Sequence, residues 1–104
     1  MAFEVVVTED AEQDLDRFLF YLVYEKRNTQ AASNLLNNFE RTKNSLKDIA
    51  GSLHYCDNER LKKLGYRRIN FDGMDYFLLY RIVDNTVFID NMFHFLQDYE
   101  HKMK

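Results

Sequence analysis

The sequence predicts an α+β fold in which a helical hairpin packs on one face of a mostly antiparallel, four-stranded sheet. Apolar residues recur at helical spacing over two long stretches, 9–27 and 29–50. Three runs rich in β-branched and aromatic residues then follow between residues 66 and 95, separated by turn-forming pairs. With a short strand before the helices, the order is β-α-α-β-β-β, which favours helices gathered on one face of the sheet.

The first half of the chain supplies one strand and the helical hairpin. Residues 3–7 form a short β-branched strand, and Thr8 is a good N-cap for the helix that follows, with three acids in its first turn. Asn28 or Thr29 caps the second helix, which ends near Gly51. The core face of the first helix is made of Ala11, Leu15, Phe18, Leu19 and Leu22.

The second half supplies the rest of the sheet. Periodicity fails between Gly51 and Gly65, so this stretch is expected to be a connection anchored by Leu61 and Leu64. Strands are predicted over 66–71, 74–83 and 86–95, with turns at 72–73 and 84–85, and a short helical tail over 98–104.

Length and composition place the chain in one domain, residues 1–104, since a second core would need roughly 100 further residues. The sequence is 46% hydrophobic and lacks any run of about 20 apolar residues, so no membrane span is expected. The first residues carry no signal-peptide pattern, and the single Cys56 cannot form an internal disulfide. These features favour a cytoplasmic protein.

The charge is polarised. A net charge of −3 argues against nonspecific coating of nucleic acid, which depends on neutralising phosphates. The first helix is acidic, whereas the stretch 60–68 holds five basic residues and no acid. Its candidate partner-binding cations are Lys62, Lys63, Arg67 and Arg68.

The middle strand, 74–83, is apolar on both faces. Phe77, Leu79 and Arg81 alternate with Tyr76, Leu78 and Tyr80. Two helices can cover only one face, so the face carrying Phe77 and Leu79 either receives a partner or is covered by the tail and the 51–65 connection. The sequence leaves both alternatives open.

Nearly the whole chain resembles the RelE/ParE family of bacterial toxins. The motifs that carry the resemblance are Leu64-Gly65-Tyr66-Arg67-Arg68-Ile69, Tyr76-Phe77-Leu78-Leu79-Tyr80-Arg81-Ile82 and His94-Phe95-Leu96-Gln97-Asp98-Tyr99-Glu100. The resemblance implies the toxin of a type II toxin–antitoxin pair, which inhibits growth, stabilises plasmids and is silenced by a cognate antitoxin. RelE-like members cut mRNA on the ribosome, and ParE-like members block DNA gyrase.

A metal-independent mRNA endoribonuclease would need an acid–base pair and a phosphate-binding cation. His94 is the candidate acid or base, and Asp75 could orient a histidine or act as base. Arg81 or Arg68 could bind phosphate, and Tyr80 or Tyr99 could stack on a base. The sequence has no metal-ligand spacing and no glycine-rich phosphate loop, so neither a metal nor a cofactor is expected.

One departure from the RelE pattern bears on the choice between the two activities. Family nucleases carry an arginine three residues before the tyrosine of the middle strand, and Phe77 occupies that position here. A subgroup uses histidines with an aspartate instead, and Asp75 and His94 fit that pattern. Phe71 stands where a further histidine would help, and His54 in the connection is the candidate to compensate. The resemblance therefore favours a ParE-like, non-nucleolytic role directed at gyrase, ahead of a RelE-like nuclease or a degenerate member that acts only as a binding module.

Two partner surfaces are expected. Phe20 and Tyr24 lie one turn apart, opposite the core face of the first helix, and suit self-association into a homodimer or an antitoxin helix. The second sheet face, with Arg67, Arg68 and Arg81, suits an acidic antitoxin tail.

Overall fold

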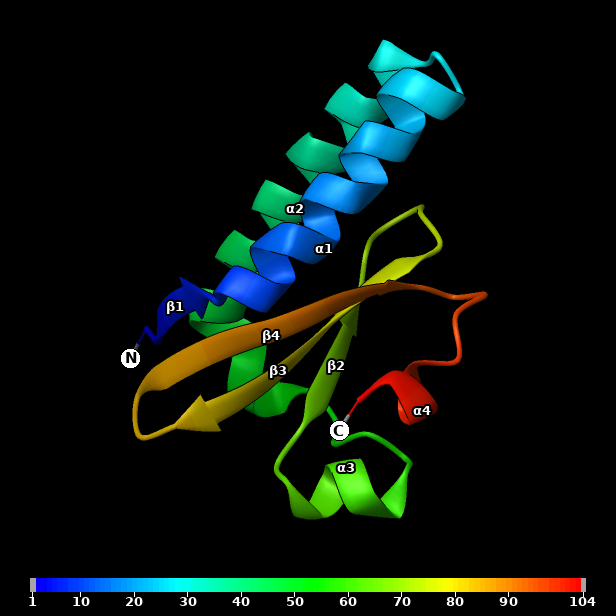
Figure 1. The fold of residues 1–104 in the computed structure, drawn as a ribbon. Helices are drawn as coiled ribbons and strands as arrows, with labels where there is room; N and C mark the ends of the chain where they lie inside the picture. The colour runs from blue at the N-terminus through cyan, green and yellow to red at the C-terminus, as the bar shows by residue number, and fades with distance from the viewer. Residues whose placement is uncertain (1, 104) are drawn as a thin grey trace.

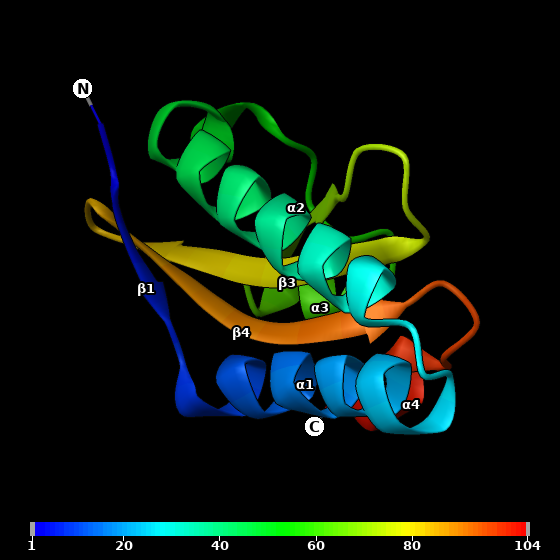
Figure 2. The ribbon, with the colours of Figure 1, turned by 90° about the horizontal axis from the view of Figure 1, so that it is seen from above.

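The hairpin and the sheet form as predicted in the computed structural model, which describes residues 2–103 (Figure 1). The two long helices lie along the long strands of the sheet (Figure 2). In chain order the elements are β1 (Glu4–Val7), α1 (Glu9–Phe20), the π-helical turn η1 (Tyr21–Glu25), α2 (Thr29–Ile49), the 3-10 turn η2 (Ala50–Ser52), α3 (Glu59–Lys63), β2 (Arg67–Asn70), β3 (Tyr76–Val83), β4 (Thr86–His94) and α4 (Tyr99–Lys102). Within this range no helix combines the length and apolar composition that a membrane crossing needs.

Side-chain caps fix where the two long helices begin. The Thr8 hydroxyl accepts the Ala11 N–H at 3.3 Å, and the Asn28 side chain accepts the Ala31 N–H at 2.9 Å. The stretch predicted as one helix over 9–27 changes after Phe20 into a π-helical turn, closed by a 3.0 Å bond from the Lys26 N–H to the Tyr21 carbonyl. The apolar periodicity of the sequence does not reveal this local widening of the helix.

The sheet has the strand order β1-β4-β3-β2. β1 pairs in parallel with β4, and the other neighbours are antiparallel. The tight turn between β3 and β4 places Asp84 at φ 56°, a left-handed conformation that aspartate tolerates. β1 and β2 are therefore the two edges of the sheet.

A β-bulge at Asp90 determines which side chains of β4 face the helices. Leu79 pairs with Asn91 but Tyr80 pairs with Ile89, so Asp90 has no partner on β3. Because the side chains of a strand alternate between faces, the extra residue returns Met92 to the face that already carries Ile89. Without it, Met92 would point away from the core beneath the helices.

The start of α1 holds this bulge in place. The Thr8 hydroxyl donates to the Ile89 carbonyl at 2.9 Å, and the Thr8 N–H bonds to the same oxygen at 3.0 Å. The buried Asp14 carboxylate accepts the Met92 N–H at 2.9 Å and the Asn91 side-chain amide at 3.2 Å. Asp14 also pairs with Arg17 on its own helix. Thr8 and Asp14 thus provide hydrogen-bond partners for backbone groups of β4 at and beside the bulge, where the β3–β4 ladder is interrupted.

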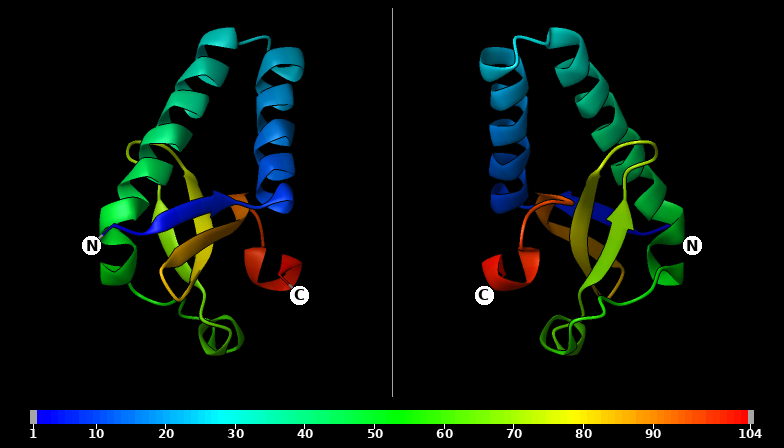
Figure 3. Two further views of the ribbon diagram at one scale, coloured as in Figure 1. Left: turned by 90° about the vertical axis from the view of Figure 1, so that its left-hand side faces the viewer. Right: turned by 90° about the vertical axis from the view of Figure 1, so that its right-hand side faces the viewer.

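The second face of the sheet is closed by the chain itself. Phe77 is 1% exposed and Leu79 fully buried, in a core with Cys56, Leu61, Phe93 and Met103. α3 and α4 lie on the side of the sheet away from the hairpin (Figure 3), and Arg60 bonds to the Glu100 and Met103 carbonyls at 2.8 and 2.5 Å. Of the two alternatives that the sequence left open, the structure supports coverage by the tail and the connection. Phe77 and Leu79 are thereby corrected from candidate partner contacts to core residues.

We expect the Asp14→Ala substitution to lower the free energy of unfolding by about 2 kcal/mol, because it leaves the buried Met92 N–H without a charged acceptor. Asp16→Ala is the matched control: Asp16 is an exposed acid on the same helix and should change stability by less than about 0.5 kcal/mol. Urea unfolding followed by circular dichroism measures both. Equal effects of the two substitutions would contradict the role given to Asp14.

Candidate functional site

Two of the candidate catalytic residues, Asp75 and His94, lie where β3 begins and β4 ends. The Phe95 N–H donates to the Asp75 carbonyl at 2.9 Å, which joins the two segments. The His94 ring packs edge-on against Tyr76, with the ring centroids 5.0 Å apart, and Tyr76 packs in the same way against Phe18 of α1. His94 is therefore held by an aromatic stack that reaches back to the helical hairpin.

The turn after β4 fixes which nitrogen of His94 carries a proton. The Leu96 N–H donates to His94 Nδ1 at 3.1 Å, and a backbone N–H can only donate, so Nδ1 must be the acceptor. The proton of the neutral ring then lies on Nε2. Gln97 reinforces the turn, since its side chain accepts the His94 N–H at 2.9 Å. In this arrangement neither ring nitrogen is free to accept a proton from a substrate.

Asp75 does not complete a catalytic pair with His94. Its side chain is exposed, and across residues 2–103 no hydrogen bond joins its carboxylate to a histidine ring. Phe71, at the position where a further histidine would help, is buried against Phe39 and Tyr76. His54 is exposed on the connection. The structure brings the backbones of Asp75 and His94 together without coupling their side chains.

Arg68 of β2 is stacked on aromatic rings. Its guanidinium carbon lies 3.7 Å from the centroid of Phe77, 5.2 Å from that of Phe95 and 5.7 Å from that of Tyr99. Its Nε donates to the Asn70 side chain at 2.8 Å. Phe77, which replaces the arginine of family nucleases, therefore serves as the floor on which Arg68 is fixed.

The other two candidate arginines, Arg67 and Arg81, also bond to groups of the chain itself. Arg81 Nε donates to the Asp90 carboxylate at 2.7 Å, and this bond raises the pKa of the Arg81 guanidinium. Tyr66 donates to the same carboxylate at 3.0 Å; burial, and then the Asp90 charge, raise the pKa of Tyr66. Arg67 donates to the Leu53 carbonyl at 2.5 Å and lies over the Tyr55 ring.

Tyr80 lies in the core beneath the helices. The side chain is fully buried, and its hydroxyl donates to the Ala50 carbonyl at 2.7 Å. Burial raises the pKa of Tyr80 to about 12, so it stays a protonated donor. This corrects its candidate role, because a buried ring cannot stack on a nucleotide. Tyr99 remains half-buried, edge-on to Phe77 with the ring centroids 5.1 Å apart.

The remaining candidate contacts are exposed at two separate places. Lys62 and Lys63 project from α3. Phe20 and Tyr24 are 60% and 64% exposed at the far end of the hairpin, with their ring centroids 4.5 Å apart, and Tyr21 beside them is 47% exposed. The helical wheel thus placed Phe20 and Tyr24 correctly on the solvent side of the hairpin.

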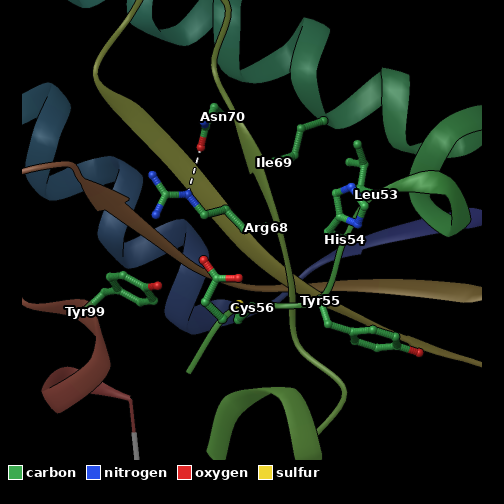
Figure 4. A pocket seen from close by; sticks show the side chains of 9 residues that line it. Leu53, His54, Tyr55, Cys56, Arg68, Ile69, Asn70 and Tyr99 are labelled. Carbon is green, nitrogen blue, oxygen red and sulfur yellow. Dashed lines mark hydrogen bonds between the residues drawn. The ribbon is translucent and has the colours of Figure 1, made fainter. Parts of the chain in front are cut away.

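A hollow of about 510 Å³ lies beside Arg68 (Figure 4). Its lining comes from three parts of the chain that are distant in sequence: residues 53–57, residues 68–70 of β2, and Tyr99.

The sequence did not indicate the roles of Asp90 and Tyr66, nor this hollow. The signal for the Arg81–Asp90 ion pair would have been Asp90 itself, the one acidic residue of β4. Across residues 2–103 no group of three or more His, Cys, Asp or Glu side chains is arranged to hold a metal ion.

Comparison with known proteins identifies a family and several structures of similar fold. Residues 5–99 match the family model of the ParE toxin of the type II toxin–antitoxin system parDE. The chain is similar to a structure of the chromosomal ParDE system from P. aeruginosa, with a TM-score of 0.71 and 16% identity over 89% of this chain and 96% of that chain. It is also similar to one from the RelBE2 toxin–antitoxin complex of Mycobacterium tuberculosis, with a TM-score of 0.59 and 22% identity over 90% of this chain and 99% of that chain. At these identities the two likenesses concern the fold alone, and no curated protein sequence matches significantly.

Proposed function

Because the chain belongs to the ParE toxin family of type II toxin–antitoxin systems, we propose that it arrests growth by a ParE-like, non-nucleolytic action on DNA gyrase. A cognate antitoxin holds it silent. Both similar structures come from toxin–antitoxin systems, which supports the antitoxin as partner.

The observation that supports the non-nucleolytic role is the hydrogen bond that the His94 ring accepts from the Leu96 N–H. RNA cleavage through the 2′-hydroxyl needs a group that can take up a proton. Nδ1 of His94 already accepts the Leu96 N–H, and a neutral ring then presents only a donor at Nε2. To act as a base, His94 would have to give up the bond that shapes the turn after β4.

The arginines support the same conclusion. A phosphoryl transition state needs a cation whose donors are free to meet the developing charge. Arg81 is neutralised by Asp90, and Arg67 is bonded to backbone carbonyls. Arg68 lies flat on Phe77, with its Nε bonded to Asn70. All three candidate arginines thus bond to groups of the chain itself, which favours action by binding.

We expect the purified chain to inhibit plasmid supercoiling by DNA gyrase and to leave mRNA intact in a translation reaction with ribosomes. His94→Asn should inhibit gyrase within about twofold of the wild type, because the asparagine oxygen can still accept the Leu96 N–H. His101→Asn, at an exposed histidine on α4, is the matched control. Ribosome-dependent mRNA cleavage that His94→Asn abolishes and His101→Asn retains would sink the gyrase proposal in favour of a RelE-like nuclease. A chain without effect on gyrase, mRNA or growth would point to a pure binding module.

The exposed aromatic group of Phe20, Tyr21 and Tyr24 is proposed as a surface for self-association or for an antitoxin helix. Large aromatics close together on a solvated helix are typical of interfaces. The group spans the end of α1 and η1, next to the loop that joins the two long helices (Figure 1).

Replacing both Phe20 and Tyr24 by serine should weaken this association by at least about tenfold. Sedimentation velocity of the toxin alone tests self-association, and a titration with antitoxin tests the helix contact. Val83→Ser is the control, since Val83 is an apolar residue that is 46% exposed at the end of β3, outside the hairpin. If sedimentation and antitoxin affinity both stay at wild-type values, this surface has neither role.

A further inference from the structure

The outer edge of β1 carries backbone groups that the sheet leaves unused. The Glu4 N–H points toward the neighbouring strand and donates to the Asn85 carbonyl, just before β4, at 3.0 Å. Alternate residues of a strand direct their backbone groups to opposite sides, so those of Val5 and Val7 point outward. Within residues 2–103, no protein group hydrogen-bonds to the outward N–H or C=O of either valine.

The chain covers only the beginning of this edge. The Phe3 N–H donates to the Lys47 carbonyl at 2.8 Å, so the end of α2 closes the edge just before β1 begins. The strand itself, Glu4–Val7, has no proline, lysine or β-bulge, which are the usual features that keep an edge from pairing. In the left view of Figure 3, β1 crosses in front of the rest of the sheet. The edge is therefore accessible to a further strand.

This edge is complementary to a second copy of itself. If two β1 strands pair in antiparallel fashion about a twofold axis at Val6, Val5 of one copy lies opposite Val7 of the other. Both residues direct their N–H and C=O outward, so the pair exchanges both N–H···O bonds, and the symmetry repeats the pair on the other side of the axis. Glu4 then lies opposite Thr8, so no like charges face each other across the strands.

The side chain at the axis is the one that the fold leaves exposed. Val5 and Val7 pack against the core beneath the helices, whereas Val6 points to the other face of the sheet and is 41% exposed. Opposite side chains come closest in a non-hydrogen-bonded antiparallel pair, which is the pair that Val6 forms with its own copy. Self-pairing would thus bury two exposed valines against each other.

The flank of α2 that faces β1 carries a cation without a partner in the chain. Lys43 lines a hollow of about 200 Å³ together with Val7, and Lys47 follows one turn later on the same flank. Lys43 pairs with Glu40 at 2.8 Å. Lys47 is exposed and takes part in no ion pair within the described part of the chain.

Antiparallel pairing brings this cation to acids of the second copy. β1 runs from the end of α2, where Lys47 lies, to the start of α1, where Glu9 and Glu12 are exposed (Figure 3). The beginning of one β1 lies beside the end of the other in an antiparallel pair. Lys47 of each copy therefore comes next to the acidic first turn of the other copy's α1, and the charges at the two helix ends are complementary.

We propose that two copies of the chain associate through antiparallel pairing of their β1 edges, with the twofold axis at Val6, so that the two sheets form one continuous sheet. This inference does not depend on the proposed action on gyrase, since it needs only the edge and the two helix ends beside it. Self-association through β1 leaves the aromatic group of Phe20, Tyr21 and Tyr24 to its other proposed role, contact with an antitoxin helix.

The test places charges at the axis and follows dimerisation by sedimentation velocity over a concentration series. Val6→Lys sets two ammonium groups opposite each other, and we expect it to weaken dimerisation at least about tenfold. Val6→Thr is the matched control, because threonine keeps the β-branched shape without a charge and should stay within about threefold of the wild type. Val6→Glu should also weaken dimerisation. An equimolar mixture of Val6→Lys and Val6→Glu should associate again, because pairing at the axis brings position 6 of one copy against position 6 of the other.

A wild type that remains a monomer up to about 0.1 mM would overturn the proposal, as would a dimer that Val6→Lys leaves unchanged or a mixture of charged variants that does not associate. A dimer lost on replacing Phe20 and Tyr24 but kept in Val6→Lys would assign self-association to the aromatic group instead. If Val6→Lys does not fold, amide hydrogen exchange on the wild type decides. Slower exchange at Val5 and Val7 with rising protein concentration supports the paired edge, and exchange that is independent of concentration refutes it.

Discussion

The unpaired residue in β4 determines how both faces of the sheet are used. With Asp90 bulged out of the β3–β4 ladder, Val87, Ile89 and Met92 all face the helices. Asp90 itself faces the opposite side, where it accepts bonds from Arg81 and Tyr66. The bulge is maintained by α1, through Thr8 and Asp14. The placement of the first helix, the composition of the main core and the neutralisation of Arg81 therefore depend on one local irregularity.

Closure of the second sheet face limits the chemistry that the protein can perform. Phe77 is buried beneath Arg68, and α4 covers the same region with Tyr99 edge-on to Phe77. A guanidinium stacked in this way is immobilised, and the arginine that family nucleases would place at position 77 is absent. Together with a His94 ring whose Nδ1 accepts the Leu96 N–H, this supports the proposal that the protein acts by binding, with the exposed aromatic group of the hairpin as one candidate surface.

Local signals predicted most of the fold. Thr8 and Asn28 are caps whose effect depends on neighbours in sequence, and the alternation of β3 reports correctly which side chains face the helices. The features that sequence could not give depend on contacts between distant residues. The bulge needs Asp14 beside Met92, 78 positions away, and burial of Phe77 needs Met103 and Leu61 folded over it. By residue type Tyr80 is a candidate to stack on a nucleotide base, but in the fold it is buried and its hydroxyl donates to the Ala50 carbonyl. Packing thus gives structural roles to Tyr80 and Arg81, which residue type alone suggested as catalytic candidates.

The most direct test of the non-nucleolytic account is the protonation state of His94 in solution, observed in long-range ¹H–¹⁵N spectra of the histidine rings at neutral pH. The account predicts an unprotonated Nδ1 and a protonated Nε2 in His94, with neither signal moving when a 3′-phosphorylated nucleotide is added. A proton on Nδ1, or shifts of the His94 ring and the Arg68 Nε–H on adding the nucleotide, would mean that this end of the sheet is free to bind phosphate and take up a proton, and would contradict it.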